Sequence, residues 1–267
     1  MNLPYIFASI DVTNPMLFYA VGFCAVLTVA LSKAGFGGAV PVGIPILMLV
    51  TTPRIALGVT LPLLLIIDVW VVFLSYKKIN LRLLGIMSIF GLFGHWIGWN
   101  FFDYISNDAL TLFIGSVSLL TVFAFFQRQF RGGTQFNQTP KDINSRMVWL
   151  RGGFWCSIAG VSCFISVSGG IPLQIFLLPY KLERSLYLGT AATFFFLLNL
   201  TKIPLYADLG ILSREIFIVS LMLIPAVPVG VFIGRKISSL LSDQQFYLGL
   251  HIMLSLVGVK LLYDVFG

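Results

Sequence analysis

Long, uninterrupted apolar runs constrain this chain more than any other feature of its sequence. Leu61–Ile67 and Phe194–Leu198 are two examples, and only 10% of the 267 residues are charged, whereas soluble domains have about 25%. Too few charges remain to cover a water-facing surface, so lipid is the expected solvent. Backbone groups in lipid need internal partners, which allows helices or closed barrels, and barrel strands alternate apolar with polar residues. The continuous runs therefore predict an all-α integral membrane protein.

About eight to ten hydrophobic segments follow one another along the chain. They lie at 16–34, 39–52, 55–76, 83–102, 109–127, 149–167, 171–180, 186–206, 214–234 and 245–264. A spanning helix needs about 20 mostly apolar residues, so 39–52 and 171–180 are too short to cross unaided. Each of these two follows a Gly-rich break, which indicates the second arm of a hairpin or of a broken helix.

The basic residues indicate the orientation, because lysine and arginine collect in cytoplasmic loops. They cluster at 77–82, 127–151, 181–184 and 235–236, which are placed inside, while acidic turns at Asp103 and Asp208 are placed outside. Both termini are then predicted to lie outside a multi-pass protein of the cell membrane, of the bacterial inner-membrane type. The net charge of +7 is accounted for in this way, and no nucleic-acid partner is expected.

The first residues of the chain lack the charge pattern of a cleavable signal peptide. Residues 1–15 contain no lysine or arginine, whereas a cleavable signal peptide begins with a basic region. The first hydrophobic segment is therefore expected to stay in the protein.

A shift of 131 positions superimposes features of the two halves. Gly38 falls on Gly169, Pro41 on Pro172, Gly58 on Gly189 and Asp68 on Asn199. Basic Lys77 falls on acidic Asp208, and such a reversal of charge is expected of an inverted repeat. The predicted organisation is an N-terminal transmembrane repeat at 1–130, a cytoplasmic linker at 131–148 and a C-terminal transmembrane repeat at 149–267.

Each half opens with a Gly-rich break and a proline, at Lys33–Pro41 and at Ser166–Pro172. Glycine lets the backbone turn sharply and proline cannot donate a helical N–H, so each stretch should interrupt a helix. A helix beginning at membrane depth presents free N–H groups and partial positive charge, which suits an anionic substrate. The alternative is that the glycines only allow close helix packing.

The paired breaks resemble those of the sulfite exporter (TauE/SafE) family of membrane permeases. The phrase Leu188-Gly189-Thr190-Ala191-Ala192 in the following helix is also similar, and the resemblance spans about Met16 to Tyr263. It implies transport of sulfite, sulfonates or related small organic anions. The first break lacks a third consecutive glycine and the second has Ser166 and Ser168 in place of glycines, so the identity of the anion stays open.

Ionisable side chains at membrane depth cost about 2.5–3.5 kcal/mol on insertion scales, which makes them functional candidates. Lys33 can neutralise an anion, Asp68 can pair with Lys33 or carry a coupling proton, and His95 can relay one. Their structural alternatives are snorkelling, an ion pair and a packing hydrogen bond. Lys202, near the outer end of its helix, is expected to snorkel to the interface.

The candidate site combines the breaks with these groups and with small hydroxyls that can donate to sulfonate oxygens. The predicted substrate-binding residues are Lys33, Gly35, Gly37, Gly38, Ser166, Ser168, Gly169, Gly170 and Thr190, and the coupling or gating residues are Asp68, His95 and Asn199.

The favoured function is secondary transport of a small organic or sulfur-containing anion by alternating access. No phosphate-binding loop or His-Glu-x-x-His motif occurs, so neither ATP use nor an enzyme is favoured, and no cofactor or metal is expected. A passive anion channel and, less well supported, a membrane-embedded enzyme are the alternatives. Protons are the candidate coupling ion, while the direction of transport and the oligomeric state stay open.

Overall fold

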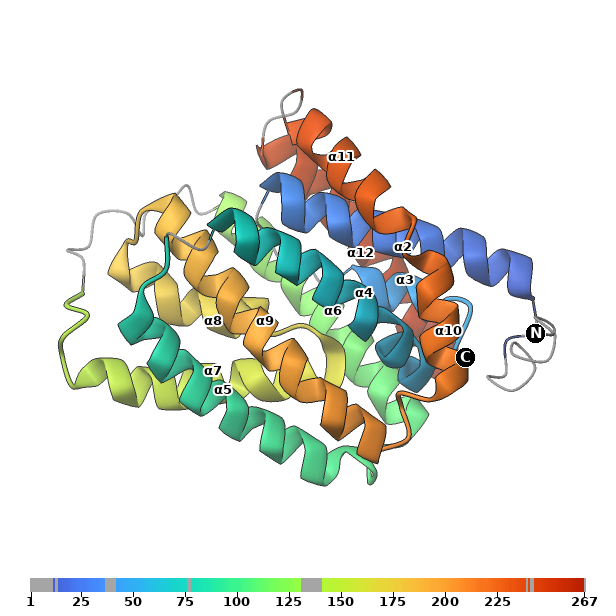
Figure 1. Cartoon of the computed structure of the whole chain (residues 1–267), viewed down its shortest axis with the longest axis horizontal. Helices are drawn as coiled ribbons and strands as arrows, with labels where there is room; N and C mark the ends of the chain where they lie inside the picture. The colour runs from blue at the N-terminus through green and yellow to red at the C-terminus, as the bar shows by residue number, and fades with distance from the viewer. Residues whose placement is uncertain are drawn as a thin grey trace.

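The computed structural model of the chain is built from helices alone in the part that it describes, namely residues 12, 14–36, 42–75, 78–130, 141–238, 240 and 243–266. The elements are α2 (Pro15–Phe36), α3 (Gly43–Leu47), α4 (Pro53–Ser75), α5 (Leu81–Phe102), α6 (Asn107–Phe130), α7 (Met147–Ser166), α8 (Gly170–Leu177), η2 (Leu178–Tyr180), α9 (Arg184–Asp208), α10 (Arg214–Leu223), α11 (Ala226–Ser238) and α12 (Asp243–Phe266). They form one bundle whose long helices run roughly along the longest axis of the molecule (Figure 1).

Seven helical stretches in the described residues are long and apolar enough to cross a membrane. Large apolar side chains such as Phe73, Leu150 and Phe232 lie exposed on the outside of the bundle. Such a surface is unfavourable in water and suits a lipid environment. The predicted all-α multi-pass membrane protein is confirmed.

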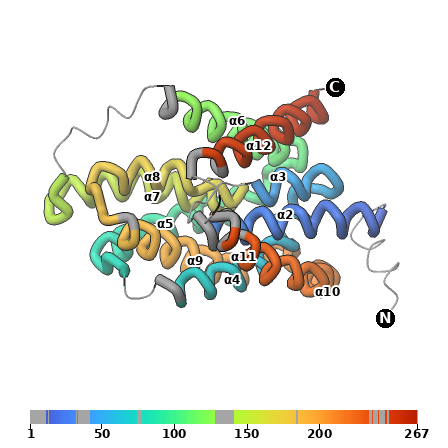
Figure 2. The backbone as a smooth tube through the Cα atoms, turned by 90° about the horizontal axis from the view of Figure 1, so that it is seen from above, coloured from blue at the N-terminus to red at the C-terminus, as the bar shows by residue number. Residues whose placement is uncertain are grey.

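The two short apolar segments form the second arms of helical hairpins, as predicted. α3 packs against α2, and α8 packs against α7. Gly43 permits the first contact, since a Cβ atom there would overlap the side chain of Val29. In both views the hairpin α2–α3 extends into the bundle from one end and α7–α8 from the opposite end, so that the last turn of α2 and the turn between α7 and α8 lie inside the bundle (Figures 1 and 2).

Each half of the chain sends one helix to pack along the first helix of the other half. α5 of the first half packs along α7 of the second, while α11 of the second half packs along α2 of the first. α4 packs against α9, and α6 against α12. The helix bounds agree with the shift of 131, because α2 and α4 would begin at 146 and 184, next to the observed starts of α7 and α9. That the two repeats are inverted relative to the membrane stays a prediction.

The predicted hydrophobic segment at 214–234 is interrupted once. The chain forms two helices, α10 and α11, with a turn at Ile224 and Pro225 between them. Proline lacks the N–H that would continue the ladder, and its ring clashes with the preceding turn. α10 contacts α4 and α11 contacts α2, so the bend lets one apolar segment cover two neighbours.

The basic and the acidic turns gather at different ends of the bundle. At one end Lys78 Nζ lies 4.0 Å from Glu183 Oε1, and Arg82 bonds to Asn144. The first turn of α2 and the last turn of α12 both lie at the other end, apart from each other (Figure 2). The grouping agrees with the charge pattern along the sequence, while the assignment of these ends to inside and outside stays a prediction.

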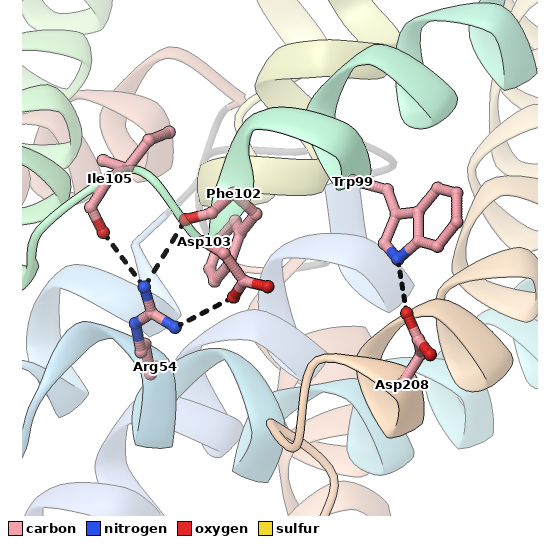
Figure 3. Close-up of polar contacts among 6 residues, drawn as sticks. All are labelled: Arg54, Trp99, Phe102, Asp103, Ile105 and Asp208. Carbon is pink, nitrogen blue, oxygen red and sulfur yellow. Dashed lines mark hydrogen bonds and ion pairs between the residues drawn. The ribbon is translucent and has the colours of Figure 1, made fainter.

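At the acidic end, Arg54 and Trp99 make polar contacts that join helices around the turn between α5 and α6 (Figure 3). Arg54, at the start of α4, donates to the carbonyl of Ile105 at 3.0 Å and lies 3.6 Å from the carboxylate of Asp103. Trp99 Nε1 donates to Asp208 Oδ2 at 2.9 Å and so ties α5 of the first half to α9 of the second.

Candidate functional site

A buried carboxylate, Asp68, connects helices from both halves of the chain. It lies on α4 and is 2% exposed. One of its oxygens forms an ion pair with Lys33 near the end of α2, and the other accepts a hydrogen bond of 2.6 Å from Asn199 Nδ2 on α9. The expected pairing of Asp68 with Lys33 is confirmed. Asp68 and Asn199 are one of the pairs that the shift of 131 superimposes, so this hydrogen bond joins corresponding positions of the two halves.

A second buried cation, Lys202, lies next to this ion pair and was not predicted as a site residue. The side chain is 0% exposed, and its Nζ donates to the carbonyl oxygen of Cys163, near the end of α7, at 2.6 Å. It interacts electrostatically with both Lys33 and Asp68. The expectation that Lys202 snorkels to the interface is wrong, because α9 packs against α4, α5 and α7 and this face is covered.

The face of α9 that carries Lys202 holds further polar groups. Asn199, Lys202 and Tyr206 follow at spacings of three and four, which places them on one side of a helix. The Tyr206 hydroxyl donates to the carbonyl of Phe164, and its ring lies 5.8 Å from Lys202 Nζ. The spacing from Asn199 was the signal in the sequence that could have identified Lys202.

His95 on α5 approaches the same group of residues. It is 1% exposed, and its Nδ1 lies 3.1 Å from the hydroxyl of Thr201. Its other ring nitrogen, Nε2, has no hydrogen-bond partner among the described residues, and neither does Asn199 Oδ1. His95 also interacts electrostatically with Lys202. The predicted coupling residues Asp68, His95 and Asn199 thus lie around Lys202.

The second break, between α7 and α8, lies beside this cluster. Val167 closes α7 in the left-handed region with φ 56°, a conformation that is rare for a β-branched residue and marks local strain. The next glycine, Gly169, is packed so closely that an added Cβ would lie 3.1 Å from the ring of Phe195, one turn before Asn199. α8 then begins at Gly170.

The serine hydroxyls of this break already have partners in the backbone. Ser166 Oγ donates to the carbonyl of Ser162 at 2.9 Å, and Ser168 Oγ donates to that of Ser166 at 3.0 Å. Each hydroxyl must rotate away from these carbonyls before it can donate to a substrate.

The remaining predicted site residues are placed less centrally. Gly37 and Gly38 lie outside the described residues, and Gly35 lies in the last turn of α2. The hydroxyl of Thr190 accepts a hydrogen bond of 2.9 Å from the backbone N–H of Asn80, at the start of α5. Thr190 precedes Asn199 by nine residues, about 13 Å along a helix, so it supports the α4–α5 turn and does not join the central cluster.

A small pocket lies between α2, α3 and α4. Thr60 and Ile67 are among the residues that line it, and its volume is about 10 Å³. That volume corresponds to about one water molecule, so an anion the size of sulfite does not fit this pocket unless the helices move. Among the described residues, no cluster of histidine, cysteine or acidic side chains could hold a metal ion.

The comparison with protein families agrees with the paired breaks and the helical fold. The family described as Sulfite exporter TauE/SafE matches residues 18–261. The chain belongs to this family. No curated protein and no solved structure matches it.

Membership in the TauE/SafE family places the protein among membrane transporters of sulfite and related sulfur anions. A small anion and the lipid bilayer are therefore its partners, and the resemblance inferred from the sequence is confirmed. Which residues of this TauE/SafE protein bind the anion stays a prediction, and the cluster around Asp68 and Lys202 is the strongest candidate in the described part of the chain.

Proposed function

We propose that this protein is a secondary transporter that moves a small sulfur-containing or organic anion, such as sulfite or a sulfonate, by alternating access. The observation that carries the proposal is the buried contact Lys33–Asp68–Asn199, which joins α2, α4 and α9 beside the second break. Ion pairs in a membrane interior are costly and mark substrate or ion pathways.

Lys33 is the proposed docking group for the anion, because its ammonium already binds one carboxylate in this conformation. A substrate anion can take the place of Asp68 at Lys33, and Asp68 is then free to accept a proton. This exchange makes protons the candidate coupling ion. The further groups of the proposed site are the backbone and hydroxyls of the two breaks, Gly35, Gly37, Gly38, Ser166, Ser168, Gly169 and Gly170, together with His95 and Asn199. Thr190, whose hydroxyl is bound at the start of α5, is not part of this site.

Alternating access requires two parts that can move against each other about a fixed site. The exchanged packing of α5 with α7 and of α11 with α2, and the hairpins that extend from opposite ends (Figure 2), support repeats at 1–130 and 149–267 related by inversion. The linker 131–148 is proposed to be cytoplasmic, with both termini outside a bacterial inner membrane.

Counterflow in proteoliposomes tests this proposal. The purified full chain is reconstituted in vesicles loaded with unlabelled sulfite or methanesulfonate, and uptake of the same labelled anion is followed. A carrier returns to one face faster when it is loaded, so we expect saturable uptake that is stimulated by anion on the opposite side. Vesicles without protein provide the control.

The alternatives give different results in the same vesicles. A passive channel shows no stimulation by anion on the opposite side, and a membrane-embedded enzyme converts the anion to another compound, which chemical analysis of the vesicle contents detects. Either result contradicts alternating access.

A further inference from the structure

Lys202 is a buried cation whose charge is not offset by a carboxylate partner. Lys33 pairs with Asp68, but no carboxylate oxygen of the described residues lies within 4.0 Å of Lys202 Nζ. Its hydrogen bond of 2.6 Å goes to the carbonyl of Cys163, near the end of α7. Carbonyls at a helix C-terminus carry only partial negative charge, so the positive charge is stabilised in part and not neutralised.

The groups around Lys202 can be counted element by element. α2 contributes the ammonium of Lys33, α4 the carboxylate of Asp68, and α5 the imidazole of His95, while α7 offers the Cys163 carbonyl and α9 the phenol of Tyr206. With His95 neutral, two ammonium groups face one carboxylate. The cluster therefore has a net charge of one positive unit in an environment where an unpaired charge is costly.

An independent observation shows that the chain alone does not satisfy this cluster. In the part of the chain that the structure describes, Asn199 Oδ1 and His95 Nε2 are both buried and have no hydrogen-bond partner. Buried polar atoms normally have partners, and exceptions point to a missing water, ion or ligand. Both atoms lie on residues that adjoin Lys202, so the unused hydrogen-bonding capacity and the unbalanced charge occur in the same place.

We propose that Lys202 is the residue that sets the charge of the transported anion, and that this anion is monovalent. The substrate headgroup, a sulfonate or hydrogensulfite, replaces the Cys163 carbonyl at Lys202 Nζ while it takes the place of Asp68 at Lys33. The two ammonium groups, the carboxylate and the monovalent anion then sum to zero net charge. A divalent headgroup leaves the cluster with an excess negative charge unless Asp68 takes up a proton. The inference rests on the proposed transport of anions and adds the charge class of the substrate.

Two probes of fixed charge test the inference, namely methanesulfonate, which is monovalent, and methanedisulfonate, which is divalent. Thermal unfolding of the purified full chain is measured against the concentration of each, since binding to the folded state raises the unfolding temperature. We expect the wild type to bind methanesulfonate at least about tenfold more tightly than methanedisulfonate, because the second sulfonate brings an uncompensated charge into the buried cluster. Equal or tighter binding of the disulfonate overturns the inference.

Substitutions separate a role in charge from a role in packing. Lys202→Met removes the charge at similar length, and we expect it to weaken binding of methanesulfonate at least about tenfold. The double variant Asp68→Asn/Lys202→Met returns the cluster to one positive unit and is expected to recover most of that loss. Lys260→Met, on the exposed face of α12, is the matched control and should bind as the wild type does.

The outcomes are distinct. Wild-type binding by Lys202→Met, or a double variant no better than the single one, overturns the role of Lys202 while leaving anion transport intact. If Lys202→Met does not fold, Lys202→Gln keeps an amide donor for the Cys163 carbonyl and tests the same loss. If neither probe shifts the wild type although the protein is folded, the proposed sulfonate transport fails and the inference fails with it.

Discussion

Asp68 joins three helices through one buried carboxylate, since it lies on α4 and binds residues of α2 and α9. Its carboxylate is covered on all sides, and both of its oxygens are bound, one by Lys33 and the other by Asn199. Removing one partner of a buried pair leaves an uncompensated charge, which typically costs about 3–5 kcal/mol. The pair therefore stabilises this conformation, and under the proposed exchange Lys33 becomes available to a substrate only when an anion replaces the carboxylate.

Replacement of Lys33 tests this exchange. We expect Lys33→Ala to unfold at a lower temperature than the wild type, because Asp68 loses its cation, and to lose most of the stabilisation given by added sulfite or sulfonate. The measurement is thermal unfolding with and without each anion. Lys260→Ala, which breaks an exposed pair with Asp264, is the control. Equal anion-induced shifts in Lys33→Ala and the wild type would remove Lys33 from the proposed site.

At the scale of helices, glycine decides how closely neighbours approach. Cβ atoms added at Gly94 on α5 or at Gly160 on α7 would overlap the backbone of the opposite helix. Gly230 on α11 has the same role against Leu27 of α2. Small residues allow such approach in lipid, where dispersion contacts drive helix association. Glycine thus allows the close approach in both helix pairs, α5 with α7 and α11 with α2. These glycines lie inside α5, α7 and α11, so they are distinct from the glycines of the two breaks.

A matched pair of substitutions on α5 tests the contact. Gly94→Ala places a methyl group against the carbonyl of Ser157, whereas Gly85→Ala adds one to a position with nothing within 4 Å. We expect Gly94→Ala to destabilise the protein by about 1–3 kcal/mol through overpacking, and Gly85→Ala to leave it unchanged or stabilise it by less than about 1 kcal/mol. Thermal unfolding in detergent measures both, and equal effects would contradict the close approach of α5 and α7.

In the whole molecule, helices of each half pack mainly against helices of the other half. α5 packs on the first helix of the other half and α11 does the same in return, so neither half completes its packing alone. The contact of Trp99 with Asp208 at the acidic end (Figure 3) and that of Asp68 with Asn199 in the interior both join the two halves. A movement between the repeats must therefore break or rearrange polar contacts at more than one depth.

Labelling of single cysteines in intact cells tests the topology. Cysteine introduced at 78 or 141 is expected to react only with a membrane-permeant reagent, and at 11 or 108 also with an impermeant one, because the basic turns are placed inside. The native Cys24 is exposed, so it is first replaced by alanine. Access to position 78 from outside alone would contradict the predicted orientation and the inverted repeat.

The sequence by itself determined the solvent, the secondary structure and the position of the breaks. Uninterrupted apolar runs identify lipid-facing helices because hydropathy is a local property, and the Gly-Pro stretches mark the interruptions because backbone conformation is local too. The shift of 131 also paired Asp68 with Asn199, which the structure brings into contact. Pro225, by contrast, was overlooked as an interruption although its effect is local.

The tertiary structure alone decided which side chains share one cluster. Lys202 lies near a helix end, and its neighbours in sequence indicate an interface, yet it is buried because α4, α5 and α7 enclose that face of α9. Thr190 belongs to the sequence Leu188–Ala192 that resembles the family, but its hydroxyl accepts a hydrogen bond from the backbone N–H of Asn80, just before α5. Burial and partnership depend on helices far apart in sequence, and their packing follows from side-chain shape and glycine contacts that no local pattern encodes.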